Sequence, residues 1–204
     1  MVAAMNTDVP TFIYGEIAKS RAGLDGLESP HYSQIMADIS SRIVESLRAG
    51  GKIMFCGNGG SAADSQHLAA ELVGRQNYNR AAAAGLALTV DTSALTAVGN
   101  DYGYDSVFSR QVEALGNAGD VLIGISTSGR SVNVVRAIEA AKRKGIITVS
   151  FTGREPRDMD IAQMQLCVPA SETAKIQELH ITCGHIIFAL VERILFPIGP
   201  SDGP

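Results

Sequence analysis

The spacing of apolar residues over the first fifty positions predicts two helices. Ile13, Ile17 and Leu24 recur at near-helical intervals. The same period returns in a second stretch, at Ile35, Ile39, Ile43, Val44 and Leu47. Gly50 and Gly51 follow directly, and glycines at that place end a helix. We therefore expect a helical hairpin over residues 10–50, ahead of the main domain.

Beyond residue 51, short apolar runs alternate with longer helical stretches. Five runs have the length and composition of buried strands, at residues 52–56, 85–88, 120–125, 146–151 and 166–168. The clearest helical stretches end near residues 75 and 144, and a last one covers 173–195. Strands joined by long helical crossovers form a parallel sheet. The sequence thus predicts one α/β domain, a three-layer sandwich with a five-stranded parallel sheet between helices, and a frayed tail over 198–204.

Composition narrows the class of protein. A length of 204 residues suits one such domain. The formal net charge is −4 and no basic block is present, which argues against nucleic-acid binding. The apolar runs are too short for a membrane span, and the N-terminus has no signal-peptide pattern. Three cysteines without CxxC spacing argue against a disulfide scaffold or a thiolate zinc site, so we expect a cytoplasmic protein.

Two loops that follow predicted strands carry candidate chemistry. The first, the glycine loop, covers residues 57–61 and reads Gly-Asn-Gly-Gly-Ser, which allows a ligand to approach the backbone closely. The second, the hydroxyl loop, covers residues 126–131 and offers four hydroxyls at a helix start, a typical phosphate site. The first loop matches neither the Walker nor the dinucleotide pattern, and the second has no lysine, so a monophosphate on a small molecule is favoured. Ser and Thr are also ordinary helix caps, and glycine turns end many strands, which leaves a purely structural interpretation open.

Polar residues on two predicted helices form a second candidate site. His67 and Glu71 are four positions apart and share one helix face, where either could bind a metal and Glu71 could act as a base. A partly exposed polar face would explain this pair equally well. The last helix carries Gln177, His180 and His185 among apolar residues, so three of the four histidines lie on helices that flank the two loops.

Together these motifs resemble those of the phosphoheptose isomerases, a family of the sugar-isomerase (SIS) superfamily. The matching segments are residues 57–67, 100–101, 119–129 with Ser131, and 174–180, and the resemblance extends from about residue 10 to Leu195. It implies a homotetramer with active sites at subunit interfaces. It also implies the aldose–ketose isomerisation of sedoheptulose 7-phosphate to D-glycero-D-manno-heptose 7-phosphate, the first step towards the ADP- or GDP-heptose used in cell-surface glycans.

The resemblance further implies a role for each matching residue. Glu71 would be the general base and His185 the general acid. One Zn²⁺ per subunit would be bound by His67, Glu71, Gln177 and His185, which are plausible ligands for this ion. The remaining matches would contact the substrate, with the hydroxyls of the second loop on its phosphate: Asn58, Gly59, Gly60, Ser61, Glu71, Asn100, Asp101, Ser126, Thr127, Ser128, Ser131 and Gln177.

Two features of the chain qualify this resemblance: the separation of two expected zinc ligands, and a loop whose sequence differs from the family pattern. Gln177 and His185 are eight residues apart, roughly 12 Å along an ideal helix, so they would reach one ion by bending or converging, or from two subunits. After Gly153, family members usually have a Gly-Gly pair where this chain has Arg-Glu-Pro-Arg-Asp over residues 154–158. We expect this loop to differ in shape, with a bearing on substrate preference but not on the reaction class.

Proteins with the same fold supply the competing interpretations. A non-catalytic adaptor of the replication-initiator-associating type shares the glycine loop and the Asn-Asp pair. It lacks the carboxylate four residues after the histidine and the later histidine, whereas this chain has Glu71 and His185. Arabinose-phosphate isomerases usually carry further C-terminal domains, and transcriptional sugar sensors carry an N-terminal DNA-binding module. The isomerase interpretation is therefore favoured.

Overall fold

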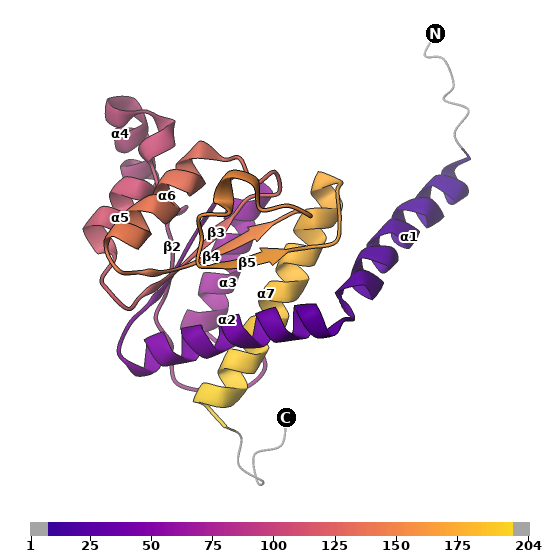
Figure 1. The fold of residues 1–204 in the computed structure, drawn as a ribbon, viewed down its shortest axis with the longest axis horizontal. Helices are drawn as coiled ribbons and strands as arrows, with labels where there is room; N and C mark the ends of the chain where they lie inside the picture. Colours follow the sequence, from indigo (N-terminus) through magenta and orange to yellow (C-terminus); the bar gives the residue numbers. More distant parts are fainter. Residues whose placement is uncertain (1–7, 198–204) are drawn as a thin grey trace.

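A computed structural model describes residues 8–197 and confirms the parallel sheet (Figure 1). The strands are β1 (Ile53–Gly57), β2 (Gly85–Ala87), β3 (Val121–Ile125), β4 (Ile147–Thr152) and β5 (Met164–Cys167), in the order β2-β1-β3-β4-β5. All neighbouring pairs are parallel. Because the order reverses between β1 and β3, the carboxyl ends of these two strands form the crevice where such sheets bind ligands.

Helices cover both faces of the sheet, which gives the predicted three layers. One core lies between the sheet and α2 (Pro30–Arg48), α3 (Gly60–Val73) and α7 (Thr173–Leu195). The other lies between the sheet and α5 (Ser109–Leu115) and α6 (Val132–Arg143). In β1, Ile53 and Phe55 face the first core and Met54 and Cys56 the second, so the strand is apolar without interruption.

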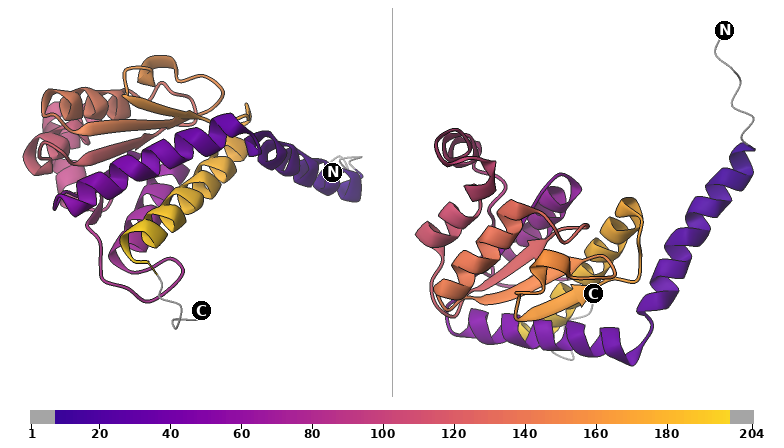
Figure 2. Two further views of the ribbon diagram at one scale, coloured as in Figure 1. Left: turned by 60° about the horizontal axis from the view of Figure 1, so that its bottom comes forward. Right: turned by 45° about the horizontal axis from the view of Figure 1, so that its top comes forward.

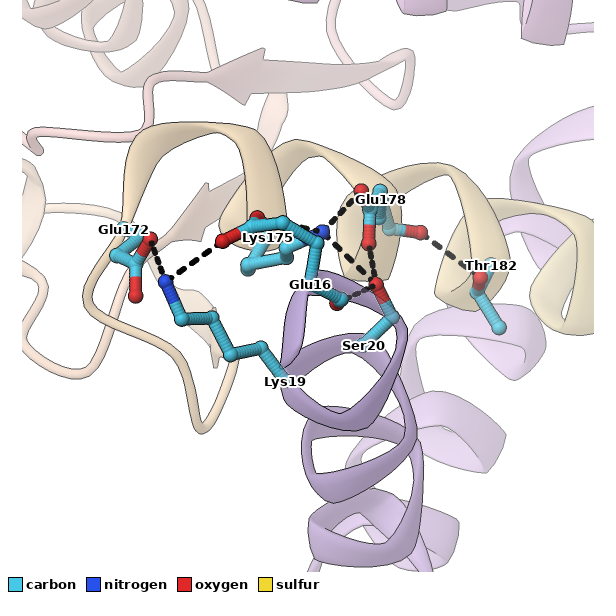
Figure 3. A network of polar contacts seen from close by, with 7 residues as sticks. All are labelled: Glu16, Lys19, Ser20, Glu172, Lys175, Glu178 and Thr182. Atoms are coloured by element: carbon cyan, nitrogen blue, oxygen red, sulfur yellow. Dashed lines mark hydrogen bonds and ion pairs between the residues drawn. The ribbon is translucent and has the colours of Figure 1, made fainter. Parts of the chain in front are cut away.

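The two N-terminal helices are confirmed, but they diverge instead of folding back on each other. Helix α1 (Val9–Leu27) ends at a short break, and α2 begins after Ser29, whose side chain accepts a hydrogen bond from Tyr32 N. Figures 1 and 2 show α1 extending away from the rest of the molecule. Its C-terminal half contacts the start of α7 through Lys19–Glu172 and Ser20–Glu178 contacts (Figure 3).

The remaining elements lie between β2 and β3 and around β5. Helix α4 (Thr92–Tyr102) and the short helices η1 (Tyr104–Ser106) and α5 fill a stretch for which the apolar pattern predicted no element. A further short helix, η2 (Arg157–Met159), precedes β5, and β5 begins two residues earlier than predicted. None of the helices within residues 8–197 combines the length and apolar character needed to cross a membrane. The tail expected to fray, 198–204, lies outside the described residues.

Candidate active site

The glycine loop and the hydroxyl loop are neighbours at the switch point of the sheet. Gly57 and Ile125, the last residues of β1 and β3, are register partners, so the two loops leave the sheet side by side. Gly59 has φ +57°, a conformation that favours glycine, and from it the chain turns directly into α3. Ser61 is buried in the first turn of that helix. The topology thus places the two loops next to each other, and a ligand shared by both remains a prediction.

Three of the four hydroxyls of the second loop face one another. Ser126 Oγ lies 2.9 Å from Ser131 Oγ and 3.3 Å from Ser128 Oγ. Ser131 is the N-cap residue of α6, yet its hydroxyl makes no cap hydrogen bond and points to Ser126. The first amides of a helix have no partner within the helix, so those of α6 remain available to an anion. This geometry favours the phosphate interpretation of these serines over an ordinary cap.

A half-buried amide pair joins the glycine loop to α6. Asn58 and Asn133 exchange two hydrogen bonds of 2.9 Å, and the Tyr104 hydroxyl donates a third bond of 3.1 Å to Asn58 Oδ1. Asn133 is 3% exposed, so the pair fixes α6 against the glycine loop. Sequence reasoning missed Asn133 and Tyr104, because neither belongs to a motif and both act through tertiary contacts.

Three of the four expected metal ligands meet between α3 and α7, and we call them the His–Glu cluster: His67, Glu71 and His185. The two Nε2 atoms are 2.9 Å apart, and Glu71 Oε1 lies 3.2 Å from His67 Nε2 and 3.4 Å from His185 Nε2. These ligand atoms all lie within 4.8 Å of one another, a spacing that could hold a metal ion. Both imidazoles are about half exposed, while the Glu71 side chain is 12% exposed.

The environment of Glu71 suits a base or a ligand. Burial raises the pKa of its carboxyl group, and the adjacent imidazoles of His185 and His67 oppose that shift. Its second oxygen, Oε2, is buried and has no hydrogen-bond partner among the described residues. A buried carboxylate oxygen without a partner is costly unless a proton, a substrate group or a cation satisfies it.

Gln177 faces the other end of the contact between α3 and α7. Its side chain lies against Gly60, where any Cβ would collide with it. Burial raises the pKa of the Asp64 carboxyl group, and the nearby Gln177 side chain opposes that shift; Asp64 Oδ2 has no hydrogen-bond partner among the described residues. One chain therefore places His185 beside His67 and Glu71, and Gln177 nearer the start of α3. Asp64 is a site residue that sequence reasoning missed, although it lies one turn before His67.

Two other predictions from the sequence have different outcomes. His180 does not face the His–Glu cluster: it is 1% exposed, and its Nε2 lies 3.0 Å from the Thr152 carbonyl oxygen of β4. Burial lowers its pKa to about 4, so it is a neutral core residue. Asn100 and Asp101 are exposed at the end of α4, and within residues 8–197 their side-chain hydrogen bond joins one to the other. Their substrate contacts remain a prediction.

A buried ion pair between Arg80 and Glu192 stabilises the backbone that carries the His–Glu cluster. Arg80 Nε donates to Glu192 Oε1 at 3.0 Å, and both side chains are almost fully buried. Arg80 Nη2 also donates to the Glu71 carbonyl oxygen at 2.6 Å. From the same loop, Gln76 donates to the His185 carbonyl oxygen at 3.0 Å and, through its backbone N–H, to Glu192. These contacts tie the end of α3 to the C-terminal half of α7, and no pattern in the sequence pointed to them.

Comparison with known proteins places this chain in a family. Residues 18–153 match the SIS domain family. A phosphoheptose isomerase from Akkermansia muciniphila is 60% identical over 153 residues, which cover 74% of this chain and 81% of that protein. One from Roseiflexus is 48% identical over 195 residues, 94% of this chain and 99% of that protein. The structure of the phosphoheptose isomerase from Neisseria gonorrhoeae superposes with a TM-score of 0.84 at 42% identity, covering 90% of this chain and 98% of that one.

Proposed function

The chain belongs to the SIS-domain proteins and, among them, to the phosphoheptose isomerase family, and we propose that it converts sedoheptulose 7-phosphate into D-glycero-D-manno-heptose 7-phosphate. The observation that carries this proposal is the convergence of a largely buried carboxylate and two imidazoles at α3, the helix that begins at the glycine loop, which itself neighbours the hydroxyl loop at the switch point. One part of this arrangement can move a proton, and the other can hold a phosphate.

The hydroxyl loop would hold the substrate by its phosphate. Ser126, Thr127, Ser128 and Ser131 supply hydroxyls, and the first turn of α6 supplies backbone N–H groups. These contacts would be the same in the ground state and the transition state, so they determine binding and orientation. The glycine loop and Gln177 would face the sugar carbons.

The chemical step moves one proton between C1 and C2 and another between the two oxygens. Glu71 would take the proton from C1 of the ketose while His185 gives a proton to the C2 carbonyl oxygen, which yields an enediol. Glu71 would then return its proton to C2, and the C1 hydroxyl would give its proton back to His185 as the aldehyde forms, which restores both residues to their starting states. Burial of Glu71 raises its basicity, and the Arg80 contact to its backbone keeps it in place.

The donor set of the cluster fits a zinc ion. His67, Glu71 and His185 offer two imidazole nitrogens and a carboxylate, and the buried Glu71 Oε2 has no hydrogen-bond partner within residues 8–197. Gln177 would complete the set. A bound zinc ion would supply Lewis acidity that polarises the substrate carbonyl.

One assay tests both the reaction and the metal. Purified protein is incubated with sedoheptulose 7-phosphate, with and without a chelator, and aldoheptose phosphate is measured. We expect product from the untreated protein, a lower rate after chelation and recovery on addition of zinc. Absence of product from folded, zinc-supplied protein would contradict the isomerase proposal and favour the adaptor alternative. Full activity in chelator would contradict the metal proposal alone.

We also propose a homotetramer with active sites at subunit interfaces. Helix α1 extends away from the body and exposes a row of large apolar side chains, namely Val9, Phe12, Ile13, Tyr14, Ile17 and Leu24. Such a face is unfavourable in water and supports burial against other copies of the chain. Size-exclusion chromatography with light scattering should give four times the chain mass, before and after chelation, and a fully active monomer would contradict the interface.

The proposed location is the cytoplasm. Cys56, Cys167 and Cys183 are all free thiols, and two of them are buried. Free thiols are typical of a reducing compartment. Fractionation of the native cell should recover the protein with cytoplasmic markers.

A further inference from the structure

The segment after β4, which lacks the Gly-Gly pair usual in the family, holds an arginine in a strained conformation. Arg157 has φ +51° and is the one non-glycine residue among residues 8–197 with a positive φ. Glycine adopts that conformation at much lower cost. Strain of this kind persists where the surrounding structure enforces it, and it is common at ligand sites. We call residues 153–158 the arginine loop.

The arginine loop packs against the hydroxyl loop. Any Cβ at Gly129 would lie 2.7 Å from the Pro156 carbonyl oxygen and 3.0 Å from Arg157 Cβ, so only glycine allows this approach. Gly129 itself has φ +66°. The two loops therefore meet at one point, and the side chain of Arg157 leaves the backbone beside the serines of the hydroxyl loop.

A hollow of about 350 Å³ opens between the two loops. Thr127 and Ser128 line it from the hydroxyl loop, and Arg154 and Arg157 line it from the arginine loop, with Arg130 completing the charged wall. One carboxylate, Glu155, also lines it and pairs with Arg157 at 2.8 Å. Arg130 and Arg154 form no side-chain hydrogen bond or ion pair within residues 8–197, so their guanidinium groups are available to a ligand.

We propose that this hollow is a second anion subsite, which lets the site bind a ligand that carries a diphosphate group. The inference rests on the proposed phosphate role of the hydroxyl loop. One phosphoryl group would occupy the hydroxyl loop, and the next would lie in the hollow between Arg130, Arg154 and Arg157. Arginine binds phosphate oxygens through two parallel hydrogen bonds, which suits this position. A diphosphate ligand would therefore compete with the sugar phosphate.

The size and lining of the hollow favour a second group over reinforcement of the first. The hydroxyl loop already offers hydroxyls and helix amides enough for one phosphate without a cation. The hollow has many times the roughly 10–15 Å³ of space that a cavity needs to hold one water molecule. A glycine at position 157 would relieve the backbone strain, yet the chain has an arginine there. This indicates that the guanidinium group has a use.

Calorimetric titration of the intact oligomer with phosphate and with pyrophosphate tests the subsite. We expect wild-type protein to bind pyrophosphate about tenfold more tightly than phosphate, the gain of one good additional contact. The double variant Arg154→Ala/Arg157→Gly should lose that gain and bind phosphate as the wild type does. Arg143→Ala removes an exposed arginine from the far end of α6 and should change neither affinity. Pyrophosphate would chelate metal equally in the wild type and in both variants. A difference in pyrophosphate affinity between these proteins is therefore due to the substituted arginines.

The outcomes separate the subsite from the function on which it rests. The second subsite would be overturned if wild-type protein bound phosphate and pyrophosphate with equal affinity. It would also be overturned if the double variant weakened the binding of both ions equally. Either result would leave the phosphate site in the hydroxyl loop intact. Failure of wild-type protein to bind phosphate at all would instead contradict the role of the hydroxyl loop. Arg157→Gly alone should melt at or above the wild-type temperature, because it relieves the positive φ. If Arg157→Gly loses pyrophosphate affinity but keeps its melting temperature, the loss of affinity is not caused by destabilisation of the fold.

Discussion

At the scale of single residues, the sequence predicts chemistry best where local geometry fixes the spacing. His67 and Glu71 share a face because any α-helix brings positions four apart together, and the structure places them 3.2 Å apart. Asp64 and Arg80 escaped prediction because their importance depends on burial and on contacts made across the fold. His180 has the same residue type as His67, yet its core position removes it from the site.

The hydroxyl loop gives the first prediction at this scale. Ser128→Ala removes a hydroxyl that would contact the phosphate in both the ground and transition states, so KM should rise while kcat changes little. A loss of one hydrogen bond to a charged group corresponds to an increase of roughly tenfold. Steady-state kinetics measure it, with the exposed Ser33→Ala as the matched control. An unchanged KM for both Ser128→Ala and Ser131→Ala would place the phosphate elsewhere.

At the scale of elements, the position of the site follows from the order of motifs along the chain. The glycine loop follows β1 and the hydroxyl loop follows β3, and the switch point of a parallel sheet joins those two ends. The stretch of α4 and α5 was not predicted, since α4 buries no residue fully and shows no clear apolar period. The direction of α1 was not predictable either, because it depends on contacts with α7 such as Lys19–Glu172.

The buried Arg80–Glu192 ion pair, which links the loop after α3 to α7, gives the second prediction. Glu192→Gln leaves the Arg80 guanidinium buried without its counter-ion, so the free energy of unfolding should fall by about 3–5 kcal/mol. The exposed pair Arg42–Glu45 supplies the control, and Glu45→Gln should cost less than about 1 kcal/mol. Chemical denaturation at fixed protein concentration compares them. Equal effects of the two substitutions would show that the buried pair does not hold α3 to α7.

At the scale of the whole molecule, buried ionisable groups couple stability to pH. Burial lowers the pKa of His180 to about 4, below the ordinary value of 6.5. Between those two pH values the unfolded chain binds a proton at His180 and the folded chain does not. The contribution of His180 to the free energy of unfolding is therefore fully present above pH 6.5 and is lost as the pH falls towards 4. Desolvation opposes ionisation of Glu192, but hydrogen bonds from Gln76, Asn77 and Arg80 lower its pKa, so its contribution is lost at lower pH still.

The third prediction is the size of that pH dependence. His180 should remove roughly 3 kcal/mol from the free energy of unfolding between pH 6.5 and 4. His180→Gln should flatten the slope in this window by about one proton, whereas the exposed His31→Gln should leave it unchanged. Denaturant titrations at a series of pH values measure both slopes. If all three proteins, wild type included, show the same slope, then His180 is not excluded from protonation in the fold.

The most direct test of the account is the rate at which Glu71→Gln converts sedoheptulose 7-phosphate. This substitution keeps the size of the side chain and removes the carboxylate that would move the proton, so kcat should fall by a factor of roughly 10² or more. Glu139→Gln, an exposed glutamate of α6, is the matched control and should keep the wild-type rate. Near-wild-type turnover by folded Glu71→Gln would contradict the claim that the His–Glu cluster carries the reaction.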